Sequence, residues 1–174
     1  MHTDLTKYFI IRRKLDTGDL VEWRSKTLLG WLIRLKTGSH VNHSSLVVKF
    51  ALEGCEHRRY VLEANARGIE LRLLSKRLKA FKGGVYWSPL LRGFGGYRDK
   101  ILGWSLDKLG TEYDYGSLVK QLISHVSVDS SRYFCSEFYQ HAMEHAGIIQ
   151  HKDYAIQPGG FHKLGFLGTE CVIK

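Results

Sequence analysis

The chain has few of the features that cross-link or divide a polypeptide. Its 174 residues include only two prolines and three cysteines, and no segment is repeated or of low complexity. The cysteines, Cys55, Cys135 and Cys171, are odd in number and form no CxxC pair, which argues against a disulfide framework and favours a reducing compartment. No linker marks a domain boundary. We therefore expect a single domain over residues 1–174.

Long apolar runs are also missing. The longest, at residues 28–33, is interrupted by Gly30 and falls far short of the roughly 20 residues that a membrane span requires. The first fifteen residues contain a short apolar run followed by basic residues, which does not fit a secretory signal. These absences predict a cytoplasmic protein, which acts elsewhere only if lysis releases it.

Acidic residues are outnumbered by basic ones, and the formal net charge is +9. The basic residues are scattered and no nucleic-acid-binding motif is present, so we expect no specific nucleic-acid partner. The densest group, Lys76, Arg77 and Lys79, is interpreted as the solvated face of a helix. In residues 26–36, a group of apolar side chains lies between basic ones. We interpret this segment as a core helix, with peripheral contact to an anionic membrane as the alternative.

Hydrophobic periodicity predicts strands mainly in the first half of the chain and helices mainly in the second. One short strand is predicted directly after the turn at Gly18-Asp19. Further strands are predicted at 45–50, 59–64, 68–73, 85–89 and 170–173, and the strands at 45–50 and 59–64 form a hairpin. The first predicted helix begins near Ser25, which is its expected N-cap. Three further helices are predicted at 101–109, 118–125 and 134–146. This order argues for an α+β domain with a mainly antiparallel sheet packed against helices.

Cys135 lies at the start of the predicted helix at 134–146. A thiol is a useful nucleophile only as a thiolate, and the unpaired N–H groups of a helix N-terminus favour that anion. On sequence alone, a cysteine between Phe134 and Phe138 is more often a small buried side chain. The position of Cys135 alone therefore does not show whether it is a catalytic nucleophile or a buried core residue.

A cysteine hydrolase also needs an imidazole base and a polar group that orients it. Among nine histidines, His43 directly precedes an apolar strand, and His40 is its close rival. Glu63 is a carboxylate in an otherwise apolar strand, a position that costs stability unless the charge is paired. With a turn centred on the polar segment at 53–58, Glu63 is not directly opposite His43. The two residues then meet through a diagonal pairing or an early turn.

Six short motifs follow one another in a recognisable order. They are Gly18-Asp19, Thr37-Gly38-Ser39, His43, Leu62-Glu63-Ala64, Gly110–Asp114 and Phe134–Glu137, followed late in the chain by Pro158–Phe161. In order and spacing they resemble the circularly permuted branch of the NlpC-type papain-like peptidases, which includes the YiiX-like and YaeF-like proteins. The resemblance covers most of the chain, although no single motif is specific.

The resemblance implies a papain-like fold with the nucleophile at a helix N-terminus. It implies that His43 is the base, Glu63 the orienter and Cys135 the nucleophile, with the backbone N–H of Cys135 as one oxyanion donor. Asn42 stands where the family usually has a serine, which leaves His40 as an alternative base. Asp19, Tyr113 and Asp114 also match the motifs, but local turns and helix ends explain them as structural residues.

The implied activity is hydrolysis of an amide bond through an acyl-enzyme, without cofactor or metal. A peptide, such as a fragment of bacterial peptidoglycan, is the expected substrate of such a bacterial or phage enzyme. The same permuted architecture also serves lipid acyltransferases and phospholipase-like enzymes, so acyl transfer or thioester hydrolysis on a lipid is one alternative. A basic binding module without turnover is the other.

One pattern points to different chemistry. Residues His141–His145 fit H-x-x-E-H, the inverted zincin pattern, in which two histidines one turn apart bind zinc. A catalytic zinc site needs a further ligand downstream. The only later carboxylates, Asp153 and Glu170, are not on a predicted helix. We therefore expect no metal there and interpret these histidines as the exposed side of the helix.

Overall fold

The structure is a computed structural model that describes residues 4–65, 68–110 and 130–174. The predicted helix at 118–125 and most of the Gly110–Asp114 motif lie outside the described residues. The backbone of Cys135 is described as part of a helix, whereas its side chain is not described.

A six-stranded antiparallel sheet forms the centre of the molecule, with strands in the order β4-β3-β2-β1-β5-β6. The strands are β1 (Leu20–Ser25), β2 (His43–Val48), β3 (Tyr60–Asn65), β4 (Gly68–Leu73), β5 (Gly83–Ser88) and β6 (Cys171–Val172). The helices are α1 (Thr6–Ile11), α2 (Leu28–Thr37), α3 (Leu74–Ala80), α4 (Arg98–Asp107) and α6 (Ser130–Ala146), with short 3₁₀ turns at Arg92–Tyr97 and Phe161–Leu164. This arrangement confirms the predicted mixed α+β class.

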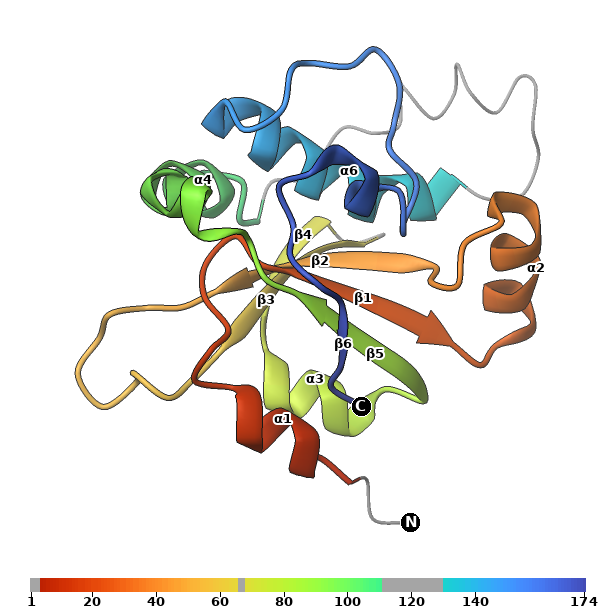
Figure 1. The fold of residues 1–174 in the computed structure, drawn as a ribbon. Coiled ribbons are helices and arrows are strands. Elements are labelled where there is room, and N and C mark those ends of the chain that lie inside the picture. The colour runs from red at the N-terminus through yellow and green to blue at the C-terminus, as the bar shows by residue number, and fades with distance from the viewer. Residues whose placement is uncertain (1–3, 66–67, 111–129) are drawn as a thin grey trace.

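Helices cover both faces of the sheet. Successive side chains of a strand point to opposite faces, so neighbouring apolar residues of one strand enter two different cores. Leu46 and Leu62 belong to a core with α4 and α6, whereas Val47 and Val61 belong to a second core with α1 and α3. Figure 1 shows α4 and α6 on one side of the sheet and α1 and α3 on the other. We call these sides the α6 face and the α3 face.

Helix α6 begins earlier than predicted. It starts at Ser130, so Cys135 is its sixth residue and lies in the second turn, not in the first. The apolar stripe begins only at Phe134, and the preceding serines carry no such signal. The backbone N–H of an interior helix residue bonds to the carbonyl four residues earlier, and the dipole effect decays within the first turn. At this position the end of the helix neither favours the thiolate form of Cys135 nor leaves its backbone N–H unpaired for an oxyanion.

Helix α2 also differs from its prediction as a core helix. Thr27, not Ser25, is its N-cap, and the Oγ1 atom of Thr27 accepts a hydrogen bond from Gly30 at 3.1 Å. Gly38 ends the helix with a left-handed backbone. The side chains of Leu28 and Leu35 are 75% and 68% exposed, so α2 contributes neither of them to the core.

Asp19 has a structural role, as its turn motif predicted. Its fully buried carboxylate accepts hydrogen bonds from the indole of Trp87 at 2.8 Å and the backbone of Leu90 at 3.0 Å, and Arg98 lies 3.1 Å away. These contacts connect β1, β5 and α4. Burial raises the pKa of Asp19 although its hydrogen bonds and Arg98 oppose that shift.

Candidate functional site

His43 and Glu63, two of the three predicted site residues, are in direct contact. The register of β2 and β3 places Leu46 opposite Leu62, which puts Glu63 opposite Ser45 and two positions from His43. The diagonal pairing that the sequence allowed is therefore the one found. The Nε2 atom of His43 lies 3.1 Å from Oε1 of Glu63. Both residues lie on the α3 face.

Glu63 is buried among groups that neutralise its charge. The hydroxyl of Ser45 donates to Oε1 of Glu63 at 2.9 Å, and Nε of Arg77 donates to Oε2 at 2.9 Å. The indole of Trp23 donates to Ser45 at 2.6 Å, and the guanidinium of Arg77 stacks over that indole at 4.5 Å. Arg77 is thus part of this cluster, which corrects its interpretation as a solvated residue on α3. The sequence could not show which side of a seven-residue helix meets the sheet.

These contacts keep Glu63 ionised. Burial by itself raises the pKa of a carboxyl group, but the hydrogen bond and charge of His43, together with Arg77, lower the pKa of Glu63 to about 2. An ionised carboxylate 3.1 Å from Nε2 fixes the orientation of the His43 ring.

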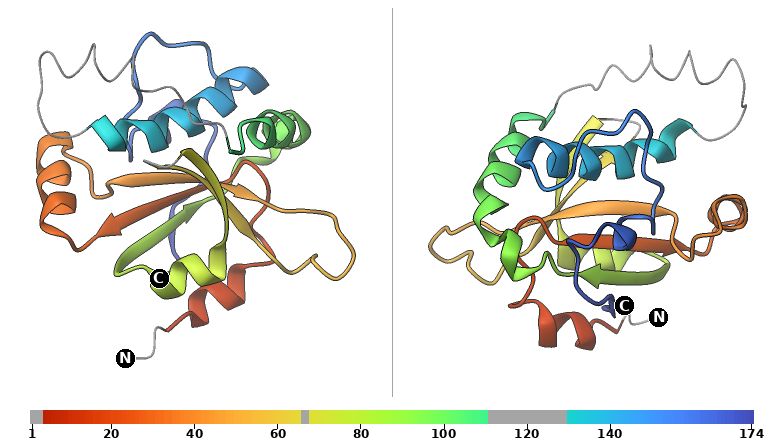
Figure 2. Two further views of the ribbon diagram at one scale, coloured as in Figure 1. Left: turned by 180° about the vertical axis from the view of Figure 1, so that it is seen from behind. Right: turned by 45° about the horizontal axis from the view of Figure 1, so that its top comes forward.

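Cys135 is carried by α6, whose first residues lie at the same end of the sheet as the start of β2, beside α2 (Figures 1 and 2). Farther along, α6 packs against β2 and β3 through Phe138, Tyr139 and Ala142, which belong to the core of the α6 face. His43 and Glu63 lie on the opposite face. The described side chains therefore join two of the three predicted residues, and the role of Cys135 stays a prediction.

His40, the alternative base, pairs with a different carboxylate. Its Nε2 atom lies 3.1 Å from each oxygen of Glu170, and its ring packs edge-on against Tyr86 at 5.0 Å. The side chain of His40 is 45% exposed, compared with 21% for His43. The more enclosed pair, with an ionised buried carboxylate, is the one at His43.

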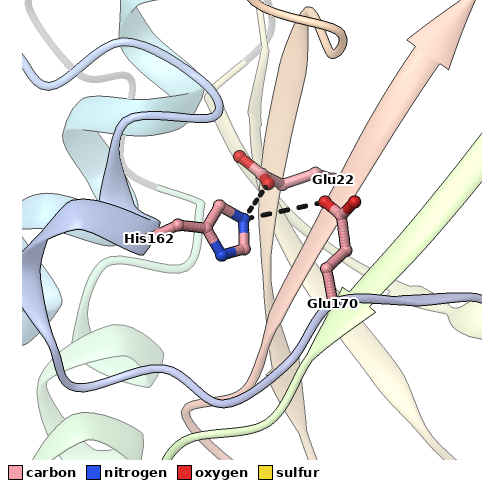
Figure 3. Close-up of side chains that lie close together, drawn as sticks. All are labelled: Glu22, His162 and Glu170. Carbon is pink, nitrogen blue, oxygen red and sulfur yellow. Dashed lines mark hydrogen bonds and ion pairs between the residues drawn. The ribbon is translucent and has the colours of Figure 1, made fainter.

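A second cluster lies on the α6 face and was not predicted. It consists of Glu22 of β1, His162 of the 3₁₀ turn and Glu170 near the C-terminus, which point toward one another in Figure 3. The Nε2 atom of His162 lies 2.9 Å from Glu22 and 3.6 Å from Glu170. Glu22 is buried, and the backbone N–H of Gly159 donates to it at 2.6 Å. The available signal was a glutamate in an apolar strand, the same signal that identified Glu63.

The second cluster has the donor set of a small metal site. Its three side chains each offer one ligand atom, and these atoms lie within 4.8 Å of one another. Within residues 4–65, 68–110 and 130–174, no other group of three His, Cys, Asp or Glu side chains meets this description. The hydrogen bond to Glu22 raises the pKa of His162, burial opposes that shift, and the charges of Glu22 and Glu170 add to it.

The H-x-x-E-H histidines have other partners. Glu144 lies 3.2 Å from Nδ1 of His141 and 3.0 Å from Nδ1 of His151. His145 instead stacks on the indole of Trp104, with ring centroids 5.9 Å apart. Glu144 also accepts a hydrogen bond from the backbone N–H of Lys152 at 3.2 Å, which anchors the segment after α6. The motif residues thus contribute to local packing and ion pairing.

Comparison with solved structures yields a likeness in fold. No protein-family model and no curated protein sequence matches the chain. The fold is similar to that of YiiX from Escherichia coli O157:H7, described as a metalloprotein of DUF1105, with a TM-score of 0.54 and 21% sequence identity. The likeness covers 78% of this chain and 68% of YiiX. In the described part of this chain, no helix has the length and apolar character needed to cross a membrane.

Proposed function

We propose that the protein is a cysteine hydrolase of the permuted papain-like type, with Cys135 as nucleophile, His43 as base and Glu63 as orienter. The observation that carries the proposal is the contact between His43 and the buried, ionised Glu63. Similarity to the YiiX fold supports it, because the sequence motifs resemble the YiiX-like proteins. The proposal adds the catalytic geometry and the permuted papain-like architecture.

The proposed reaction proceeds in two steps through a thioester. Because α6 and the His43–Glu63 pair lie on opposite faces of the sheet, the reaction requires the thiol of Cys135 to reach Nδ1 of His43 past the end of the sheet where β2 begins. His43 then accepts the thiol proton, and the thiolate attacks the acyl carbon of the substrate. The leaving amine departs with the proton from His43. A water molecule then gives a proton to His43 and attacks the thioester, which releases the carboxylic acid and restores the thiol. Throughout, Glu63 holds the Nε2 proton and stabilises the imidazolium form.

Labelling with a thiol-directed acyl probe at neutral pH tests this assignment. We expect labelling to be lost in Cys135→Ala and reduced in His43→Gln, because the thiolate forms only with its base. The matched controls are Cys171→Ala, which removes an exposed thiol, and His40→Gln, which removes the alternative base. Labelling that persists in Cys135→Ala, or that is lost in His40→Gln but not in His43→Gln, contradicts the assignment.

The substrate is proposed to be an amide in a peptide, such as a peptidoglycan fragment. Mass spectrometry of adducts trapped on Cys135 after exposure to a cell extract tests this choice. A peptide adduct supports the amidase, and a fatty acyl adduct replaces it with lipid acyl transfer. Enzyme that labels with the acyl probe but accumulates neither adduct contradicts both substrate classes.

A second candidate function is metal binding at Glu22, His162 and Glu170. The observation that favours it is the convergence of three ligand atoms of a type that zinc accepts, and the structurally similar YiiX is described as a metalloprotein. Three protein ligands leave one coordination position for water or substrate in a zinc site. His40 lies beside the group through its contact with Glu170.

Zinc titration of the metal-free full-length chain tests this second function. We expect one equivalent to bind to the wild type and the affinity to fall by roughly tenfold or more in His162→Gln, because a direct ligand is lost. His151→Gln is the matched control, since His151 also pairs with a glutamate but lies outside the cluster. Equal zinc affinity of the wild type and His162→Gln contradicts the site. This titration does not involve Cys135, so its outcome is separate from that of the labelling experiment.

A further inference from the structure

Helix α2 presents an apolar stripe to solvent. Leu28, Trp31, Leu32 and Leu35 follow the spacing i, i+3, i+4 and i+7, which places them on one side of a helix. Their exposed fractions are 75%, 52%, 45% and 68%. Such a stripe normally packs into a core, so the exposure of all four side chains marks α2 as an interaction surface.

Basic side chains surround this stripe. A pocket of about 750 Å³ lies beside it, between α2 and strands β1 and β5. Arg24, Lys26 and Arg34 line the pocket together with Leu28, Trp31 and Tyr86, and no acidic residue is among the lining residues. The partner of this surface must therefore combine apolar groups with negative charge.

We propose that α2 binds the surface of an anionic lipid membrane. The four apolar side chains enter the boundary between head groups and acyl chains, while Arg24 and Lys26 contact lipid phosphates. A tryptophan among leucines beside basic residues is typical of helices that lie in this interface. A second copy of the chain fits less well, since it brings the same cations to the contact and the chain as a whole is strongly positive.

The position of α2 gives the contact a direction. The helix stands at the end of the sheet where β2 begins, and the first residues of α6 lie at that end in each view of Figures 1 and 2. His43 is the first residue of β2. Membrane binding through α2 therefore turns the His43 end of the molecule toward the lipid. The surface does not involve Cys135, so it stands whether or not that residue is a nucleophile.

Flotation of the full-length chain with lipid vesicles tests the proposal. We expect binding to vesicles of phosphatidylcholine mixed with phosphatidylglycerol, and much weaker binding to phosphatidylcholine alone, because the cations need anionic phosphates. The double variant Leu28→Ser/Leu35→Ser should bind mixed vesicles roughly tenfold more weakly or worse, since two apolar side chains no longer leave water. Binding should also shift tryptophan emission to shorter wavelength, and this shift should be lost in Trp31→Phe.

Matched variants elsewhere on the surface serve as controls. Arg24→Glu/Lys26→Glu should weaken vesicle binding by more than roughly tenfold. Lys76→Glu/Lys100→Glu makes the same change of net charge away from α2. This control variant should bind vesicles more tightly than Arg24→Glu/Lys26→Glu does. Leu52→Ser alters an exposed leucine in the turn after β2 and should bind like the wild type. Absence of vesicle binding, equal binding to both vesicle types, or wild-type binding by Leu28→Ser/Leu35→Ser overturns the proposal. The proposal is also overturned if light scattering shows that the wild type is a dimer that does not bind vesicles and that the Leu28→Ser/Leu35→Ser variant is a monomer.

Discussion

Two glutamates in apolar strands are each buried beside a histidine. Glu63 pairs with His43 on the α3 face, and Glu22 pairs with His162 on the α6 face. A buried carboxylate is tolerated only when its charge is compensated, so each strand position requires a cationic or hydrogen-bonding partner. The same local signal therefore occurs at two separate clusters. Only Glu63 was singled out from the sequence, where it lies in a strand that follows a candidate base, His43.

The Glu63 cluster predicts a loss of stability in acid. The folded pKa of about 2 lies below the unfolded value of 4.5, so the stabilisation is fully present above pH 4.5 and is lost as pH falls toward 2. The shift corresponds to about 3 kcal/mol. Urea unfolding of the wild type and Glu63→Gln between these pH values measures it. We expect the difference between the two proteins to shrink as pH falls.

The control for this experiment is Glu70→Gln. Glu70 lies directly opposite Glu63 on β4 and bonds Nε of Arg72 at 2.8 Å, but both partners of that ion pair are partly exposed. Such a pair contributes about 0–1 kcal/mol, so Glu70→Gln should change stability little. A difference between wild type and Glu63→Gln that is the same at every pH would contradict the buried, ionised state of Glu63.

At the scale of elements, the backbones of strands β1 and β5 approach each other closely. A Cβ atom added at Gly83 would overlap the carbonyl oxygen of Arg24 on the neighbouring strand β1. We predict that Gly83→Ala destabilises the protein by about 1–3 kcal/mol or more, because backbone of a paired strand cannot move aside. Thermal unfolding measures this change.

Gly103 offers the opposite case in helix α4. An added Cβ there meets no atom within 4 Å, and alanine is the better helix former. Gly103→Ala should therefore stabilise the protein by about 0.5–1 kcal/mol. If Gly83→Ala proved as stable as the wild type, the close β1–β5 contact would be wrong.

At the scale of the whole molecule, the two ends of the chain meet in one core. Ile173 follows the edge strand β6 and is fully buried in the cluster of the α3 face, which also contains Tyr8 of α1. Ile173→Ala should cost about 2–5 kcal/mol of unfolding free energy, because it leaves a cavity. The neighbouring Val172 is 48% exposed, and Val172→Ala should cost less than about 1 kcal/mol. Equal costs for the two variants would show that the C-terminal segment does not close this core.

Local pattern in the sequence was sufficient for most strands and for the fold class. Strand β4 spans residues 68–73 as predicted, since β-branched and apolar residues bounded by glycine specify a strand locally. Glu63 was identifiable for a related reason, because a charge in an apolar strand requires a partner wherever the strand lies. The order of the motifs further predicted that Glu63 orients His43.

The tertiary structure decided what depends on contacts between distant segments. The stripe of α2 has the spacing of a core helix, yet no described element covers Leu28, Trp31, Leu32 or Leu35, and periodicity cannot reveal whether a partner exists. Likewise, Glu22 and His162 are 140 residues apart in the chain and meet only because the sheet and the 3₁₀ turn fold together. A sequence specifies which side chains need partners, whereas the packing of its elements determines which partners they find.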